Sequence, residues 1–459
     1  MMKLVLLLFV LILATAPSSL SQCTPPAGGW TQANQQPSTC VPFPASIFSK
    51  PLPSNVGSHI VTTPSGPYTA SSDTMINTML TTSGAYQGGS FIYAGDIGNQ
   101  NSSFYYGRSN ANGDATYKFT ACTYGEGAMS SALNVPFHLS HSGLYVGSGY
   151  DKNYVIWDQP NDNIFFGYQG NAGGGLGGFG GGQVIPACPG TTGHAGTDAD
   201  PCPVSVNLTC GIAHGWSTNV DPRSTTYGGW ESMGSLGPVG MVRLKELVDG
   251  HIYHALYLNE YFNNCDSGGH SLHVYPNLTG RGTSSCGGTG YAPSGALIFA
   301  DYTPSQLADM CPASLCGTAG AHALPPWQYT MIEAMTKYGG YIGDGGLPGI
   351  TQMRMESVLP YAKLGVPTPA PPGFSSTLSW LASQANSGCS GNCSLEMFKN
   401  VPLQGGTGIQ SHLHVADQCI ALGLAGQPGG CVGTPPPGAP IPSSAGAPSA
   451  PTGLTAVVQ

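Results

Sequence analysis

The chain has 459 residues, of which only 8% are charged, and its 22 acidic and 13 basic side chains give a net charge of −9. An ordinary domain carries about 25% charged residues, so glycine, hydroxyl and amide groups must cover much of this surface. No basic stripe is present to neutralise phosphates, which argues against nucleic acid or an anionic membrane surface as partner. Neutral or weakly charged glycans are compatible with this composition.

Residues 1–21 have the pattern of a secretory signal peptide. Lys3 supplies a positive charge, Leu4–Ala14 is wholly apolar, and Ser19-Leu20-Ser21 places small residues before a cleavage point near Ser21–Gln22. An apolar run of this length is too short to cross a bilayer, which needs about 20 residues. We therefore expect the protein to be secreted and extracellular, without membrane insertion.

The cysteine pattern indicates disulfides. All 14 cysteines follow the signal peptide, and an even number in an exported chain favours disulfide pairing. The connectivity stays open, although Cys311 with Cys316 and Cys389 with Cys393 are neighbouring candidates. No Cys-x-x-Cys pair occurs, which argues against a structural zinc or a thioredoxin-like redox site.

Short β-rich runs bounded by turn residues recur along the chain. They cover 90–93, 116–120, 154–157, 163–166, 252–258, 272–275 and 296–299. Residues 158–162 separate two of these strands and are typical of a hairpin loop.

Helical patterns are fewer and shorter. Residues 244–248 form one or two turns before Gly250, and Thr303 with Pro304 predicts a capped helix as far as Met310. The strongest helix covers 326–338, and 375–385 is another candidate. Together these elements predict a mainly β protein with a β-sandwich or jelly-roll core, a few short helices and long disulfide-pinned loops.

The β-sandwich domain is expected to cover residues 22–432. Its glycine-rich segment 171–182 matches a dinucleotide-binding fingerprint, but residues 181–186 cannot start the helix that this site requires. Residues 433–447 form a Pro/Gly/Ser/Ala linker. Residues 448–459 resemble the first strand of a fibronectin type III module, a module that often joins domains of secreted polysaccharide-degrading proteins.

Five blocks, in order, resemble a family of secreted bacterial β-sandwich-like proteins. They are Ser46–Pro53, Tyr154–Asp158, Val239–Leu256, His273–Pro276 and Ala334–Asp344. The most recognisable block contains a short helix followed by a strand reading His-Ala-Leu. The resemblance implies a scaffold similar to that of β-sandwich carbohydrate-active proteins, which is an analogy of fold.

Acidic residues are few, so each is a candidate for chemistry. Glycoside cleavage typically needs two carboxyl groups, and Asp158, Glu246 and Asp344 are the candidates because they lie in or next to predicted elements. We predict that two of these three face one cleft, with His254 as a proton carrier. The alternatives are a turn residue at Asp158, a solvated helix face at Glu246, a loop cap at Asp344 and a hydrogen-bonded core histidine at His254. Glu260 and Glu356 also lie in or beside predicted elements.

Candidate substrate-binding residues combine aromatic rings with polar groups, because an apolar sugar face stacks on an aromatic ring. They are Arg243, Trp216, Trp230, Tyr291 and His273. No cofactor and no metal are expected. His412 and His414 would share one face of a strand, with Asp417 as a third ligand, but a short histidine pair is weak evidence for a metal.

These observations predict a secreted carbohydrate-active protein that acts on a polysaccharide through paired carboxylates, in the manner of a glycoside hydrolase. Two alternatives stay open. The first is a non-catalytic glycan-binding or cell-surface adhesion module, and the second is a structural extracellular protein. The expected partner is a polysaccharide or other glycan, not a nucleic acid.

Overall fold

Over the residues that it describes, the computed structural model contains similar amounts of helix and strand. It describes residues 24–41, 47–82, 92–94, 97, 102–108, 115–122, 137–139, 144–145, 154–168, 184–185, 202–206, 209–214, 239–260, 264–266, 272–274, 276–277, 286–343, 351–390, 392–401 and 411–417. The predicted β-sheets are confirmed, but helices are more abundant than a mainly β chain would have. The signal peptide, the linker and the fibronectin-like segment lie outside the described residues.

Most of the described helices lie in the second half of the chain, whereas the described strands occur in both halves. The helices are α1 (Ser72–Thr82), α3 (Leu244–Asp249), α4 (Pro304–Met310), α5 (Ala313–Cys316), α6 (Pro326–Lys337), α7 (Leu359–Leu364) and α8 (Thr377–Ala382), with 3-10 turns at Ile47–Ser49 and Val56–His59. The strands are β1 (Tyr93–Ala94), β2 (Ser103–Gly107), β3 (Ala115–Cys122), β4 (Phe137–Leu139), β5 (Leu144–Tyr145), β6 (Tyr154–Asp158), β7 (Asn163–Tyr168), β8 (Val184–Ile185), β9 (Cys202–Val206), β10 (Thr209–His214), β11 (Leu256–Glu260), β12 (Leu297–Ala300), β13 (Gly340–Ile342), β14 (Thr351–Met353), β15 (Ser387–Ser390), β16 (Asn392–Glu396) and β17 (Leu413–Ala416).

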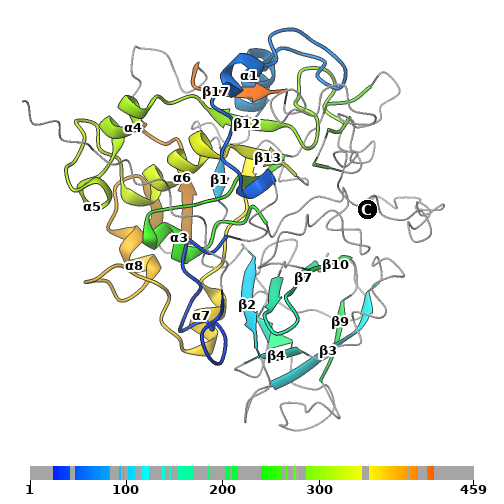
Figure 1. Cartoon of the computed structure of the whole chain (residues 1–459), viewed down its shortest axis with the longest axis vertical. Helices are drawn as coiled ribbons and strands as arrows, with labels where there is room; N and C mark the ends of the chain where they lie inside the picture. The colour runs from blue at the N-terminus through cyan, green and yellow to red at the C-terminus, as the bar shows by residue number, and fades with distance from the viewer. Residues whose placement is uncertain are drawn as a thin grey trace, which may run out of the picture.

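The main sheet has eight strands in the order β15-β16-β1-β14-β11-β13-β12-β17. It is mixed, because β1 is parallel to β14 and β11 is parallel to β13, whereas its other pairs are antiparallel. A second sheet has the order β10-β7-β6-β2, and two smaller sheets contain three and two strands. Figure 1 shows most of the helices gathered around the main sheet, with β2, β3, β7 and β9 at the lower end, where α7 lies beside β2.

Two apolar cores lie on the two faces of the main sheet. Strand β12 shows this directly, because Ile298 and Ala300 belong to the core shared with the helices, whereas Leu297 and Phe299 belong to the other core. This alternation is the two-residue period of a strand that is buried on both faces. The second core also contains residues of β2, β6 and β7, so the four-stranded sheet contributes to it.

Several predicted elements are confirmed. Helix α4 begins where Thr303 and Gln306 cap each other, with Thr303 Oγ1 accepting from the Gln306 amide at 3.3 Å and Gln306 Oε1 accepting from the Thr303 amide at 2.8 Å. Helix α6 follows the prediction to within one residue, and the 158–162 loop joins the antiparallel strands β6 and β7.

Other predicted elements differ from the structure. The strand expected over 252–258 begins only at Leu256, and the one expected over 272–275 is reduced to a bridge between His273 and Ser294. Helix α1 was missed because only Asp73 among its polar positions is charged, so the contrast with its buried Met75, Ile76 and Met79 is weak. Tertiary packing of these three side chains therefore stabilises a helix that the sequence pattern alone does not predict.

Three disulfides are present among the described residues: Cys265–Cys286, Cys311–Cys316 and Cys389–Cys393. Two of them are the neighbouring pairs that the spacing suggested. Disulfides persist in oxidising compartments, so they fit an extracellular protein. In the described part of the chain no helix combines the length and apolarity that crossing a membrane requires.

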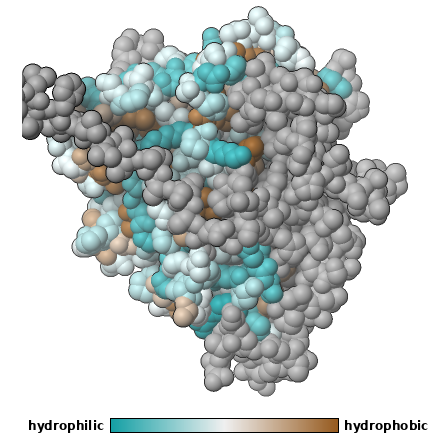
Figure 2. Space-filling model, in the orientation of Figure 1, coloured by the Kyte–Doolittle hydropathy of each residue, from teal (hydrophilic) through white to brown (hydrophobic). Residues whose placement is uncertain are grey.

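The described surface is polar. Figure 2 shows hydrophilic residues spread over the visible described face, with apolar residues in scattered small areas. Phe374, at 38% exposed, is the one large apolar side chain that the described residues present to solvent. This surface agrees with a composition in which uncharged polar groups replace charged ones.

We expect Gly295→Ala to destabilise the fold more than Gly317→Ala. Both glycines have positive φ angles, +85° and +75°, which cost an L-residue about 1–2 kcal/mol. A Cβ atom at Gly295 would also lie 2.0 Å from the Val274 carbonyl oxygen, whereas nothing lies within 4 Å at Gly317. Urea unfolding of the two variants checks this prediction, and equal losses of stability would contradict it.

Candidate functional site

Three of the predicted site residues, Arg243, Glu246 and His254, meet in one buried network. Arg243 Nη2 donates to Glu246 Oε1 at 2.6 Å, and His254 Nε2 lies 3.3 Å from the same carboxylate. The Glu246 and His254 side chains are 0% exposed and Arg243 is 2% exposed. The hydrogen-bonded core histidine considered for His254 is therefore confirmed, whereas the solvated helix face considered for Glu246 is wrong.

The N-terminal segment 24–41 closes the network from one side. Arg243 Nη1 donates to Gln36 Oε1 at 2.8 Å, and Nη2 donates to the Cys40 carbonyl oxygen at 2.9 Å. Next to these contacts, Gln32 Nε2 donates to the Phe104 carbonyl oxygen in β2 at 2.9 Å. The guanidinium therefore ties the start of α3 to a segment more than 200 positions earlier in the chain.

A second carboxylate, Glu356, completes the network. The first amides of a helix have no intrahelical partner, so acceptors at this end stabilise the helix. At α3, Glu246 Oε2 accepts from the Arg243 amide at 2.8 Å and Glu356 Oε2 accepts from the next amide, that of Leu244, at 2.9 Å. The Tyr361 hydroxyl donates to Glu356 Oε1 at 2.5 Å. Two acids thus cap consecutive amides of one helix.

The environments of the two acids shift their pKa values in opposite directions. Burial alone would raise the pKa of Glu246, but the positive charge of Arg243 and the contact with His254 lower it to about 2. Burial raises the pKa of Glu356 to about 7, although the Tyr361 hydroxyl and the Leu244 amide act against this rise. Separated pKa values are typical of an acid and base pair in catalysis.

Access argues against catalysis by this pair. A general acid must come within hydrogen-bond distance of the bond that it protonates. Glu246 is 0% exposed and Glu356 is 1% exposed, so a glycosidic oxygen has no path to either carboxyl group in this structure. The geometry instead supports a role in holding α3, α7 and segment 24–41 together.

Asp158 lies in a different place, at the end of β6 in the four-stranded sheet. Its Oδ2 atom accepts from Asn161 Nδ2 at 2.7 Å within the same hairpin, so the turn role considered for it is confirmed. The side chain is 1% exposed, and burial raises its pKa to about 6. Asp158 therefore also has no access to a polysaccharide in this structure.

The structure describes only two of the remaining candidates, Tyr291 and His273. Asp344, Trp216 and Trp230 lie outside the described residues. Tyr291 is only 8% exposed, which leaves little ring surface for a sugar. His273 is half-buried, and burial lowers its pKa.

His414 lies in β17 and His412 immediately precedes it, and their common partner is Asp301 rather than Asp417. His412 Nδ1 lies 2.7 Å from Asp301 Oδ1, and His414 Nε2 lies 3.0 Å from Asp301 Oδ2. Among the described residues, no group of three or more His, Cys, Asp or Glu side chains is placed to hold a metal ion. These contacts therefore join β17 to the end of β12.

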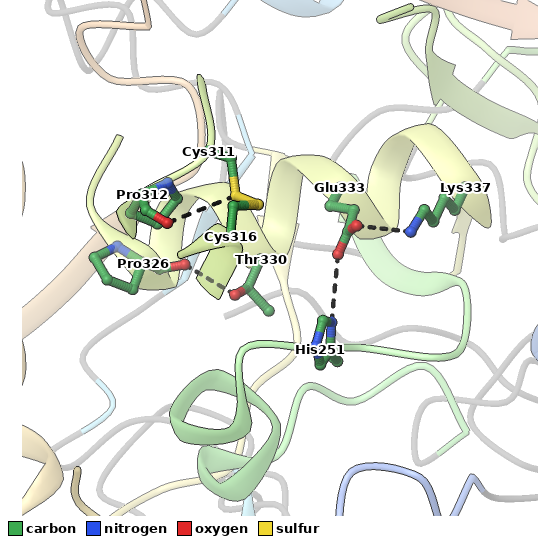
Figure 3. Close-up of a disulfide and its surroundings, with 8 residues drawn as sticks. All are labelled: His251, Cys311, Pro312, Cys316, Pro326, Thr330, Glu333 and Lys337. Atoms are coloured by element: carbon green, nitrogen blue, oxygen red, sulfur yellow. Dashed lines mark hydrogen bonds and ion pairs between the residues drawn. A yellow bond between two sulfur atoms is a disulfide. The ribbon is translucent and has the colours of Figure 1, made fainter. Parts of the chain in front are cut away.

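His251 and His254, which both precede β11, have different surroundings. Figure 3 shows His251 beside helix α6, where it lies 3.6 Å from Glu333, a residue that also pairs with Lys337 at 2.6 Å. His251 is 47% exposed, whereas His254 is buried. The same view shows the Cys311–Cys316 disulfide next to the start of α6.

Sequence reasoning missed Glu356 and Tyr361 as members of the network. Glu356 was one acid among several beside a predicted element, and no local motif marks either residue. No family model, curated protein or solved structure matches the chain. The assignment of function therefore rests on the geometry and composition of this chain alone.

Proposed function

We propose that this chain is a secreted, non-catalytic glycan-binding or adhesion protein. The observation that carries this proposal is the burial of its described candidate acids, because Glu246, Glu356 and Asp158 are each 0–1% exposed. A binding protein needs no accessible acid pair, and amides, hydroxyls and aromatic rings are sufficient to hold a neutral sugar.

The composition supports a glycan as the ligand. With 8% charged residues and 68 glycines, the chain has few groups for recognising phosphates or strongly charged peptides. The disulfides favour an extracellular setting, where polysaccharides are abundant partners. Secretion itself is part of the proposal and rests on the signal-like residues 1–21.

We also propose a β-sandwich arrangement for the core. The support is the second apolar core, which combines Trp157 and Phe166 of the four-stranded sheet with Phe299 and Tyr341 of the main sheet. Side chains of two sheets that meet in one core are typical of a sandwich.

Cleavage by paired carboxylates stays a prediction, and its remaining candidate is Asp344 in the undescribed part of the chain. A hydrolase would need Asp344 and a second acid about 5–10 Å apart in an open groove. The structural alternative, an extracellular protein without a ligand, predicts no retention on any glycan.

We expect the secreted protein to be retained on at least one insoluble polysaccharide without releasing reducing ends. Incubation with a panel of polysaccharides, followed by measurement of bound protein and reducing ends, tests this. Asp344→Asn should bind as the wild type does, and Glu333→Gln serves as a control at a surface ion pair. Reducing ends that appear with the wild type and vanish with Asp344→Asn would replace our proposal by the hydrolase.

A further inference from the structure

Residues 354–357 connect the four-stranded sheet to the start of helix α3 through backbone hydrogen bonds. On one side, the Ser102 amide donates to the Met355 carbonyl oxygen at 3.1 Å, and the Ser357 amide donates to that of Ser102 at 2.9 Å. On the other side, the Val242 amide donates to the Arg354 carbonyl oxygen at 3.0 Å, and the Glu356 amide donates to that of Val242 at 2.8 Å. Ser102 immediately precedes β2 and Val242 lies just before α3, so this segment, here called the junction segment, joins the four-stranded sheet to the helix.

The Glu356 side chain lies at the centre of this junction, and its partners differ from those of Glu246. Its two oxygens face neutral donors, the Tyr361 hydroxyl and the Leu244 amide. The Arg243 guanidinium hydrogen bonds instead reach Glu246, Gln36 and Cys40. An ionised Glu356 would therefore place a second buried negative charge near Glu246 without a direct bond to a cation, which a buried site disfavours.

We propose that Glu356 is a protonation-sensitive latch, which keeps the junction segment closed while its carboxyl group is neutral and lets it open when that group ionises. The charged and titratable groups that act on this site are Arg243 and Glu246 from the start of α3, Tyr106 from β2, Tyr361 from α7, and His254, which contacts Glu246. The proposal does not depend on the proposed glycan function.

The direction of the effect follows from linkage. A glutamate has an ordinary pKa of 4.5 when the open junction admits water, and burial raises the pKa of Glu356 in the closed junction to about 7. Below pH 4.5 both states hold the proton, so this group favours neither state. Between 4.5 and 7 the open state releases its proton first, so opening becomes about tenfold easier per pH unit. Above pH 7 both states are ionised and the effect levels off at roughly 300-fold.

Hydrogen–deuterium exchange of the full protein between pH 4.5 and 7.5, corrected for the intrinsic exchange rate, tests this latch. In the wild type, the opening constant of the amides that form the junction hydrogen bonds, those of Ser102, Val242, Glu356 and Ser357, should rise by up to roughly 300-fold over this range. Glu356→Gln should remove this dependence, because glutamine keeps an acceptor for the Leu244 amide but cannot ionise. Asp158→Asn removes a different buried acid and should leave the dependence at the junction unchanged.

Two results would overturn the latch: a wild-type junction whose opening is independent of pH, or a Glu356→Gln variant that keeps the wild-type dependence. If Glu356→Gln does not fold, the Tyr361→Phe variant tests the same proposal. The Tyr361 hydroxyl bond lowers the pKa of Glu356, so its loss should move the upper end of the transition to higher pH. A Tyr361→Phe protein with an unmoved transition would equally refute the latch.

Discussion

Replacing Arg243 with methionine is expected to lower the free energy of unfolding by about 3–5 kcal/mol. The guanidinium is 2% exposed and makes hydrogen bonds to Glu246, Gln36 and the Cys40 carbonyl oxygen. Methionine fills a similar volume, but the buried Glu246 carboxylate then loses the guanidinium that pairs with it. Urea unfolding at pH 7, where Glu246 is ionised because its pKa is lowered to about 2, measures the loss.

Lys337→Met provides the matched control for this prediction. Lys337 forms an ion pair with Glu333 at 2.6 Å, but its side chain is 53% exposed. Exposed ion pairs contribute about 0–1 kcal/mol, so this variant should unfold near the wild-type midpoint. A second check is the double variant Arg243→Met with Glu246→Gln, which should lose less stability than the sum of the single losses. Equal losses of unfolding free energy in Arg243→Met and Lys337→Met would show that the buried network does not stabilise the fold.

Replacing Trp327 with alanine is expected to lower the free energy of unfolding by about 3–5 kcal/mol. Trp327 stands at the start of α6, is 0% exposed and belongs to the core between the helices and the main sheet. Alanine would leave a cavity that the rigid neighbouring strands cannot fill, so the loss combines transfer and cavity terms. Thermal and urea unfolding both measure it.

Two comparisons isolate the cause of the Trp327 effect. Trp327→Phe should cost less, because it keeps most of the buried ring and removes an indole N–H that has no hydrogen-bond partner among the described residues. Phe374→Ala removes an aromatic ring that is 38% exposed, so it should have a small effect. A Phe374 loss as large as the Trp327 loss would contradict the assignment of Trp327 to the core.

Local elements were predictable where short-range chemistry decides them. Thr303, Pro304 and Gln306 place a cap, a first-turn proline and a reciprocal acceptor within four positions, so the start of α4 could be predicted without the fold. The 158–162 loop and the two short-range disulfides follow for the same reason, since their partners are close in the chain. Helix α1 escaped prediction because its buried face contrasts only weakly with a polar face on which Asp73 is the one charged residue.

The candidate site was predictable only in part. Arg243, Glu246 and His254 lie within twelve positions of one another, and the sequence marked all three as candidates. Their burial was not predictable, because segment 24–41 and the junction segment cover them from distant parts of the chain. His412 and His414 show the same limit, since their partner Asp301 lies more than 100 positions away.

By itself, the sequence determined the scarcity of charge, the disulfide-forming cysteines and the helices and turns whose signals span a few residues. Only the tertiary structure decided that Glu356 caps the amide next to the one capped by Glu246, across a separation of 112 positions from Leu244. The physical reason is that a carboxyl group's protonation and access depend on what buries it. The residues that bury it come from segments far apart in the chain, and no local sequence pattern predicts that these segments pack together.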